Sequence, residues 1–200
     1  MIKKYVILAS LMSFLCLTGC EDMMGNYLEK APSVDVTEDD IFSSATNVET
    51  FLASIYKYGI HSNLGYGDGD VNGPYGTIMA GATDEAETCA PWYSTNNWNS
   101  ASITADRTDD GRFHYRWVAI RKVTTMLKRV DEVPDIDREY AEQLKAESKV
   151  IRALNYFEMF KHYGGVPIID HYIELDEDFK IPRATVAQTV DFILKDIEEA

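Results

Sequence analysis

Residues 146–169, with the sequence AESKVIRALNYFEMFKHYGGVPII, decide the fold. They belong to a longer segment, 137–162, whose apolar spacing predicts a helix that is amphipathic in its first half. Residues 150–160 are apolar on most sides, so we expect the second half to be buried between neighbouring elements. The two glycines at 164–165 end this helix, and the Val-Pro pair at 166–167 starts an extended segment.

A helix on the N-terminal side is predicted over residues 48–56, where apolar side chains recur at i, i+3, i+4, i+7 and i+8. Gly59 is placed to stop this helix. Residues 37–40, Thr-Glu-Asp-Asp, resemble a capping box and predict a short helical turn before it. Residues 23–36 contain Pro32 and little periodicity, which is typical of an extended tether.

Two further helices flank the central one. Residues 113–130 follow two aspartates and carry a continuous apolar stripe, and residues 185–188, Thr-Val-Ala-Gln, form a capping box for a last helix. The apolar stripe predicted for that last helix comprises Val186, Val190, Ile193, Leu194 and Ile197. We expect helix 113–130 to pair with helix 137–162, and helix 137–162 to pair with the last one. The periodicity continues to Ala200, so we expect this sequence to be the N-terminal part of a longer protein.

Residues 59–110 lack helical periodicity and are rich in Gly, Asn, Ser and Thr, which predicts a long irregular excursion. A loop of this length inside a compact domain usually carries function. Sugars present apolar C–H faces ringed by hydroxyls, so aromatic rings beside amide side chains suit them. The candidate ligand-binding residues are Trp92, Tyr93, Asn97, Trp98 and Asn99. The alternative is that the two tryptophans only anchor the loop onto the helices.

The N-terminus resembles the signal peptide of a bacterial lipoprotein. Lys3 and Lys4 precede an apolar run over residues 5–17, which is too short to span a bilayer. Leu-Thr-Gly then leads to Cys20, as in a lipobox, so we expect residues 1–19 to be a signal peptide and Cys20 to be lipidated. Residues 20–36 would then form a lipidated tether, and residues 37–200 a helical domain. A plain secretory signal or an uncleaved anchor is the alternative.

The composition excludes several classes of protein. The 200 residues are 46% hydrophobic, which is enough to bury one core and argues against disorder. A formal net charge of -14 repels phosphate backbones, which argues against a nucleic-acid partner and mildly against polyanionic glycans. With Cys20 lipidated and Cys16 removed, Cys89 is the remaining thiol, and we expect it to be buried and inert.

No catalytic or cofactor motif is evident, so we predict a protein without enzymatic activity, cofactor or metal. The four histidines show no metal-ligand spacing, and neither a G-x-S-x-G elbow nor a P-loop occurs. Residues 84–87 contain three acids that we interpret as a solvated patch rather than a hydrolase pair. Asp68, Asp70 and Asn72 match the first half of a calcium loop, but Met79 occupies the position of its bidentate glutamate. Open alternatives there are a calcium site and a flexible polar turn.

The motifs together resemble the SusD/RagB family of nutrient-uptake lipoproteins of Bacteroidota. The strongest match is residues 146–157, AESKVIRALNYF, which continues through 163–169, YGGVPII. Three other stretches occur in the expected order, and with the lipobox the resemblance covers nearly the whole chain. These stretches are YLEKAP at 27–32, Phe42 with the helix over 47–56, and IPRATV at 181–186 leading to DIEEA at 196–200. Family members are much longer than this sequence.

The resemblance implies tetratricopeptide-like helical hairpins that are lipid-anchored at the outer face of the outer membrane. It further implies a partner, a SusC-like TonB-dependent transporter, to which the protein passes a nutrient without chemical change. The ligand in the family is usually an oligosaccharide and in some members a peptide. Glu21 and Asp22 after the lipidated cysteine resemble a surface-routing tag, although a solvated acidic tether has the same sequence. A peptide-binding or purely structural lipoprotein on the same scaffold remains the alternative. Arg152 lies in a half-helix that we expect to be buried, so it needs a carboxylate partner and we assign it a structural role.

Overall fold

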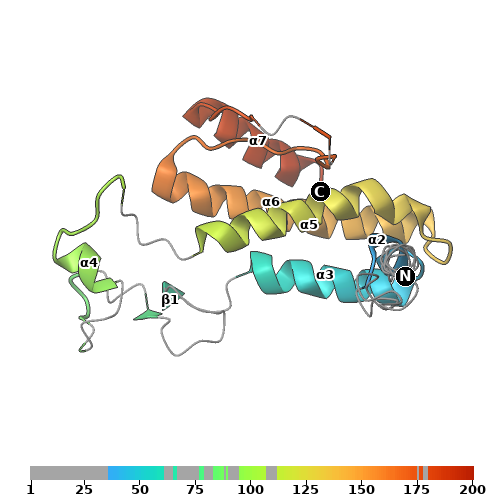
Figure 1. Cartoon of the computed structure of the whole chain (residues 1–200), viewed down its shortest axis with the longest axis horizontal. Helices are drawn as coiled ribbons and strands as arrows, with labels where there is room; N and C mark the ends of the chain where they lie inside the picture. The colour runs from blue at the N-terminus through green and yellow to red at the C-terminus, as the bar shows by residue number, and fades with distance from the viewer. Residues whose placement is uncertain are drawn as a thin grey trace, which may run out of the picture. The chain divides into compact units, whose positions relative to one another are not determined.

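The computed structural model describes residues 36–60, 65–66, 77–78, 83–87, 89, 95–106, 112–174, 176–177 and 180–200. This part of the chain is mainly helical, as predicted (Figure 1). The helices are α2 (Glu38–Ile41), α3 (Ala45–Gly59), α4 (Thr95–Asn99), α5 (Phe113–Arg129), the 3-10 turn η2 (Val130–Glu132), α6 (Arg138–Tyr163) and α7 (Val186–Glu198). Strands β1 (Gly65–Tyr66) and β2 (Thr77–Ile78) pair antiparallel, with Gly65 opposite Ile78. Among the described residues, none of the helices combines the length and apolarity needed to cross a bilayer.

Residues 68–73, which match the first half of a calcium loop, the predicted lipidation site Cys20 and the predicted tether over residues 20–35 lie outside the described residues. So do the predicted signal peptide, Trp92 and Tyr93. The excursion over residues 59–110 is less irregular than predicted, because it contains the β1–β2 pair and α4. Each of these elements is too short to give a periodic signal in the sequence.

Local capping explains where the helices begin. Thr37 and Asp40 form the predicted capping box of α2, with the Thr37 hydroxyl accepting from the Asp40 amide at 3.2 Å. Asp137 caps α6 by accepting from the Tyr140 amide at 2.8 Å. Thr185 and Gln188 form the capping box predicted for α7. These three starts were predictable because the donor and the acceptor lie three residues apart.

Helices α3, α5 and α6 pack around one apolar core. Val48 and Ile55 of α3, Val123 of α5, and Leu144 and Ile151 of α6 are fully or almost fully buried in it. A second core lies between α5, α6 and α7, where the rings of Tyr156 and Phe192 meet edge to face at 4.9 Å. Both predicted pairings, of α5 with α6 and of α6 with α7, are therefore confirmed (Figure 1).

The prediction for the C-terminal half of α6 was partly wrong. Ile151, Tyr156 and Met159 are buried as expected, but Val150, Leu154 and Phe157 are exposed. These three residues lie at i, i+4 and i+7, so they form one stripe along the helix. The half-helix therefore has neighbours on only part of its circumference within the described chain.

The stripe predicted for α7 was mostly wrong as well. Val186, Leu194 and Ile197 are about half exposed, and Ile193 is the member that is buried. The inward face of α7 instead carries Thr189, Phe192, Ile193 and Asp196. Asp196 points inward because the buried guanidinium of Arg152 on α6 requires a carboxylate there. This ion pair sets which face of α7 points toward α6.

α3 ends at Gly59, as predicted, although Gly59 is not in the left-handed region. It is the last residue of the helix and lies where α3 approaches α6 most closely, since an added Cβ would be 2.3 Å from Cγ2 of Ile151. The side-chain amide of Asn155 donates to the Gly59 carbonyl oxygen at 3.1 Å. Glycine is therefore required here for close packing between two helices.

Candidate functional site

The predicted aromatic and amide residues are partly described. Asn97, Trp98 and Asn99 lie together on α4, and the Trp98 side chain is 39% exposed. The amide of Ser102 donates to the Asn97 carbonyl oxygen at 2.8 Å, and Ala101 closes the helix with a left-handed φ of 53°. Successive residues of a helix point in different directions, so α4 does not bring all three side chains onto one face. An exposed indole alone is nevertheless a suitable platform for a sugar ring.

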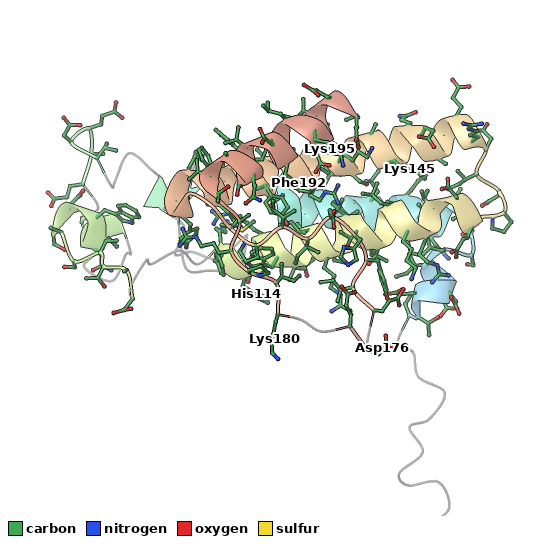
Figure 2. All side chains as sticks on the ribbon, turned by 90° about the horizontal axis from the view of Figure 1, so that it is seen from above. His114, Lys145, Asp176, Lys180, Phe192 and Lys195 are labelled. Atoms are coloured by element: carbon green, nitrogen blue, oxygen red, sulfur yellow. The ribbon has the colours of Figure 1, made fainter. Side chains whose placement is uncertain are left out.

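A second candidate site is a cleft of about 430 Å³ beside α5, which sequence reasoning missed. Its two walls are the outer face of α5 and the segment that follows α6. The cleft is lined by His114, Trp117, Val118, Arg121 and Thr124 of α5 and by Ile169, Tyr172, Ile173, Glu174 and Glu177 of the segment. Figure 2 shows His114 on α5 beside this segment. The volume falls within the range of about 300–1,000 Å³ that is typical of small-ligand pockets.

The end of α6 positions the second wall of the cleft. Gly164 ends the helix with a φ of 70°, which confirms the predicted stop. Two side chains of α6 then bind the backbone of the following segment. The Ile169 amide donates to the Tyr156 hydroxyl at 2.7 Å, and the Arg152 guanidinium donates to the Asp170 carbonyl oxygen at 3.1 Å. Burial raises the pKa of Tyr156, so this hydroxyl stays protonated at neutral pH.

Charged contacts fix the outer part of the same wall. The Lys128 ammonium pairs with Glu174 and lies 4.1 Å from the centre of the Tyr172 ring. The Tyr172 hydroxyl donates to the carboxylate of Glu38 at 3.3 Å, which links the segment to α2. The carboxylate of Glu174 is therefore neutralised by a neighbouring cation.

His171 joins two carboxylates at the edge of the cleft. Its Nδ1 lies 2.7 Å from Asp170 and its Nε2 lies 2.9 Å from Glu177. The hydrogen bond to Asp170, followed by that to Glu177, raises the pKa of His171 above its ordinary value of 6.5. The same contacts lower the pKa of Asp170 and of Glu177. All three shifts favour the imidazolium with both nitrogens donating.

The stability contributed by His171 is expected to fall as the pH rises. Because the pKa of His171 is raised in the folded state, its stabilisation is complete below the unfolded pKa and is lost as the pH passes the folded pKa. The unfolding free energy of the unmodified protein should contain a contribution from His171 that is larger at about pH 6 than at about pH 8.5. We expect His171→Gln to reduce this difference between the two pH values. Urea unfolding at both pH values measures this difference. Arg138→Gln, which removes an exposed side chain of α6, is the control and should leave this difference unchanged, because an arginine keeps its charge at both pH values.

Other predicted residues fall outside both candidate sites. Asp84, Glu85 and Glu87 are exposed, which agrees with a solvated patch. Cys89 is exposed, so the prediction of a buried thiol was wrong; it lies in the excursion rather than on a core-facing helix. Across the described segments, no group of three or more His, Cys, Asp or Glu side chains is placed to hold a metal ion.

Arg152 has the structural role predicted for it, but its partner comes from another helix. Its guanidinium is bidentate to Asp196 of α7, with both N–O distances at 2.7 Å. Both side chains are almost completely buried. The sequence indicated the need for a carboxylate but not which one, because the two residues are 44 positions apart.

The cleft was missed for a similar reason. Its walls are separated by more than forty residues along the chain, and each wall reads as ordinary amphipathic sequence. A signal was nevertheless present on α5. His114, Trp117 and Arg121 lie at i, i+3 and i+7, which places an indole between two basic side chains on one helix face.

Comparisons with known proteins agree with this architecture. A SusD-like family model, described as starch-binding and associating with the outer membrane, matches residues 26–200. A SusD-like protein of Formosa agariphila is 29% identical over 82 residues, which cover 40% of this chain and 16% of that protein.

Solved structures of SusD-like proteins share the fold. One from Bacteroides fragilis is 24% identical with a TM-score of 0.59, and the match covers 86% of this chain and 32% of that one. A laminarin-binding SusD-like protein is 18% identical with a TM-score of 0.65, and the match covers 79% of this chain and 34% of that one. The chain thus spans about a third of the length of these structures and a smaller share of the curated relative.

Proposed function

Because this chain belongs to the SusD-like family, whose model matches it from residue 26 to residue 200, we propose that it captures an oligosaccharide at the cell surface. It delivers this ligand to a SusC-like TonB-dependent transporter of the outer membrane and performs no chemistry on it. The laminarin-binding relative supports a glycan as the ligand. The family description supports the location at the outer membrane.

The proposed anchoring follows from the N-terminal sequence. Residues 1–19 are cleaved as a signal peptide, and Cys20 carries the lipid that holds the protein on the extracellular side of the membrane. Residues 20–36 are the tether, and residues 37–200 form the helical domain. The Lys3-Lys4 pair, the apolar run and the Leu-Thr-Gly-Cys ending support this assignment.

The exposed indole of Trp98 carries the proposal for the ligand. A tryptophan that is 39% exposed offers a flat apolar surface to the C–H face of a sugar ring, and Asn97 and Asn99 are its neighbours on α4 with amide side chains. Trp92 and Tyr93, a few residues earlier in the sequence, are the other aromatic residues that we assign to ligand binding. Amide side chains donate and accept hydrogen bonds without adding charge, which suits a neutral polysaccharide.

Trp98→Ala is expected to weaken polysaccharide binding by about tenfold or more, since an exposed aromatic anchor dominates such a contact. Affinity electrophoresis through gels that contain a panel of neutral polysaccharides, laminarin included, measures the effect as lost retardation. The control is Phe157→Ala, which removes an aromatic ring of comparable exposure, 44%, from α6. It should migrate like the unmodified protein.

A melting curve of the same variants separates this proposal from its alternative. If Trp98 only anchors the excursion, Trp98→Ala lowers the melting temperature and leaves retardation unchanged. That result, or the absence of retardation in every gel, would contradict glycan capture through α4.

A further inference from the structure

The interior of the cleft beside α5 is apolar. Trp117 and Val118 form one wall, Ile169 and Ile173 form the other, and all four are only partly buried. Val118, Ile169 and Ile173 offer no hydrogen bonds to sugar hydroxyls, so these three aliphatic side chains favour a hydrophobic group over a glycan. A hydrophobic group in the cleft would bury apolar area of all four wall residues that is now exposed to water, which is favourable.

The charges at the mouth of the cleft are unevenly compensated. The two acids that line it are engaged, Glu174 by Lys128 and Glu177 by His171. Arg121 is exposed, and no described carboxylate forms an ion pair with it. Arg121 therefore lines the cleft with its charge uncompensated by any described carboxylate, in a chain that has 33 acids and 19 lysines and arginines. The cleft therefore offers a cation to an incoming anion, while opposite it Glu174 is paired with Lys128 and Glu177 is hydrogen-bonded to His171.

We propose that this cleft binds the C-terminal residue of a peptide, with a hydrophobic side chain inside and the terminal carboxylate on Arg121. The guanidinium can take the carboxylate in a bidentate contact, which a neutral ligand could not provide. His114 lies seven residues before Arg121 on the same helix face and adds a second donor at the mouth. This site is separate from α4 and does not depend on glycan capture.

The test compares the tripeptide Ala-Ala-Leu with its C-terminal amide by isothermal titration against the intact protein. We expect the acid to bind about tenfold more tightly than the amide, because only the acid carries the anion. Arg121→Gln should abolish this difference while keeping the length of the side chain. Arg138→Gln removes an exposed arginine that does not line the cleft, and it should keep the difference.

A second variant tests the cavity itself. Val118→Trp places a large ring in the cleft and should remove binding of acid and amide alike, whereas retardation by polysaccharide should persist because it depends on Trp98. Equal affinity for acid and amide, no binding of either, or an unchanged preference in Arg121→Gln would overturn the proposal. So would loss of polysaccharide retardation in a folded Val118→Trp variant, because it would assign the cleft to glycan. Failure of the peptide test with retardation intact leaves glycan capture standing.

Discussion

Asp196→Ala is expected to destabilise the protein by about 3–5 kcal/mol, because it leaves the Arg152 guanidinium buried without its counter-charge. Arg152 is 4% exposed and Asp196 1%, so water cannot replace the lost carboxylate. The guanidinium also lies 5.0 Å from the centre of the Phe192 ring, and this contact alone cannot compensate a full charge. Chemical denaturation of the unmodified protein and the variant measures the difference in unfolding free energy.

Two further variants identify the cause of this loss. The double variant Arg152→Met/Asp196→Leu replaces the pair by apolar side chains, and it should recover most of the stability. Glu199→Gln breaks the Lys149–Glu199 pair, which joins the same region of α6 to the end of α7 at 3.1 Å and whose carboxylate partner is exposed. This control should change stability little. A double variant as unstable as Asp196→Ala would show that the pair itself, rather than an uncompensated charge, is required.

The sequence predicted α2, α3, α5, α6 and α7 because their signals are local. The starts at Thr37, Asp137 and Thr185 depend on contacts over three residues, and the stop at Gly164 depends on one backbone conformation. Such features are complete within one turn of helix, so no knowledge of the tertiary structure is needed to see them.

The orientation of α7 could not be predicted in this way. Hydropathy favours Val186, Leu194 and Ile197 as the inward face, yet these residues are exposed and Asp196 is buried. The deciding interaction is with Arg152, 44 residues earlier, and the sequence pattern of α7 carries no information about this contact. A buried charge selects its partner through space, and this overrides the hydropathy of the partner's own helix.

The two candidate sites differ in how well they could be predicted from the sequence. Asn97, Trp98 and Asn99 are neighbours in the chain, so their combination was visible at once, while their use in binding stays a prediction. The cleft depends on Gly164 and Gly165 turning the chain back along α5. Its lining residues come together only when the chain has folded and both walls are in place.

Gly165→Ala is expected to cost about 3 kcal/mol or more, at the upper end of overpacking effects. A Cβ at this position would lie 2.0 Å from the carbonyl oxygen of Ala184 and 2.9 Å from the carbonyl carbon of Thr185. Both are backbone atoms, so no side-chain rotation can relieve the clash. The segments must separate instead, which breaks the hydrogen bond from the Ala184 amide to the Val166 carbonyl oxygen at 3.2 Å.

Moving residues 165 and 184 apart would also displace the wall of the cleft and the start of α7, because the contact between them joins the two ends of the connection from α6 to α7. The Arg183 guanidinium donates to the Gly165 carbonyl oxygen at 2.6 Å, and Thr185, the cap of α7, follows directly. Gly164→Ala is the matched control: its Cβ would touch only a Val186 methyl at 3.4 Å, so its cost is limited to the backbone strain of φ 70°. Chemical denaturation should therefore give a lower unfolding free energy for Gly165→Ala than for Gly164→Ala. The reverse order would mean that the positive-φ backbone of Gly164 at the end of α6, rather than the close approach of residues 165 and 184, fixes the wall of the cleft.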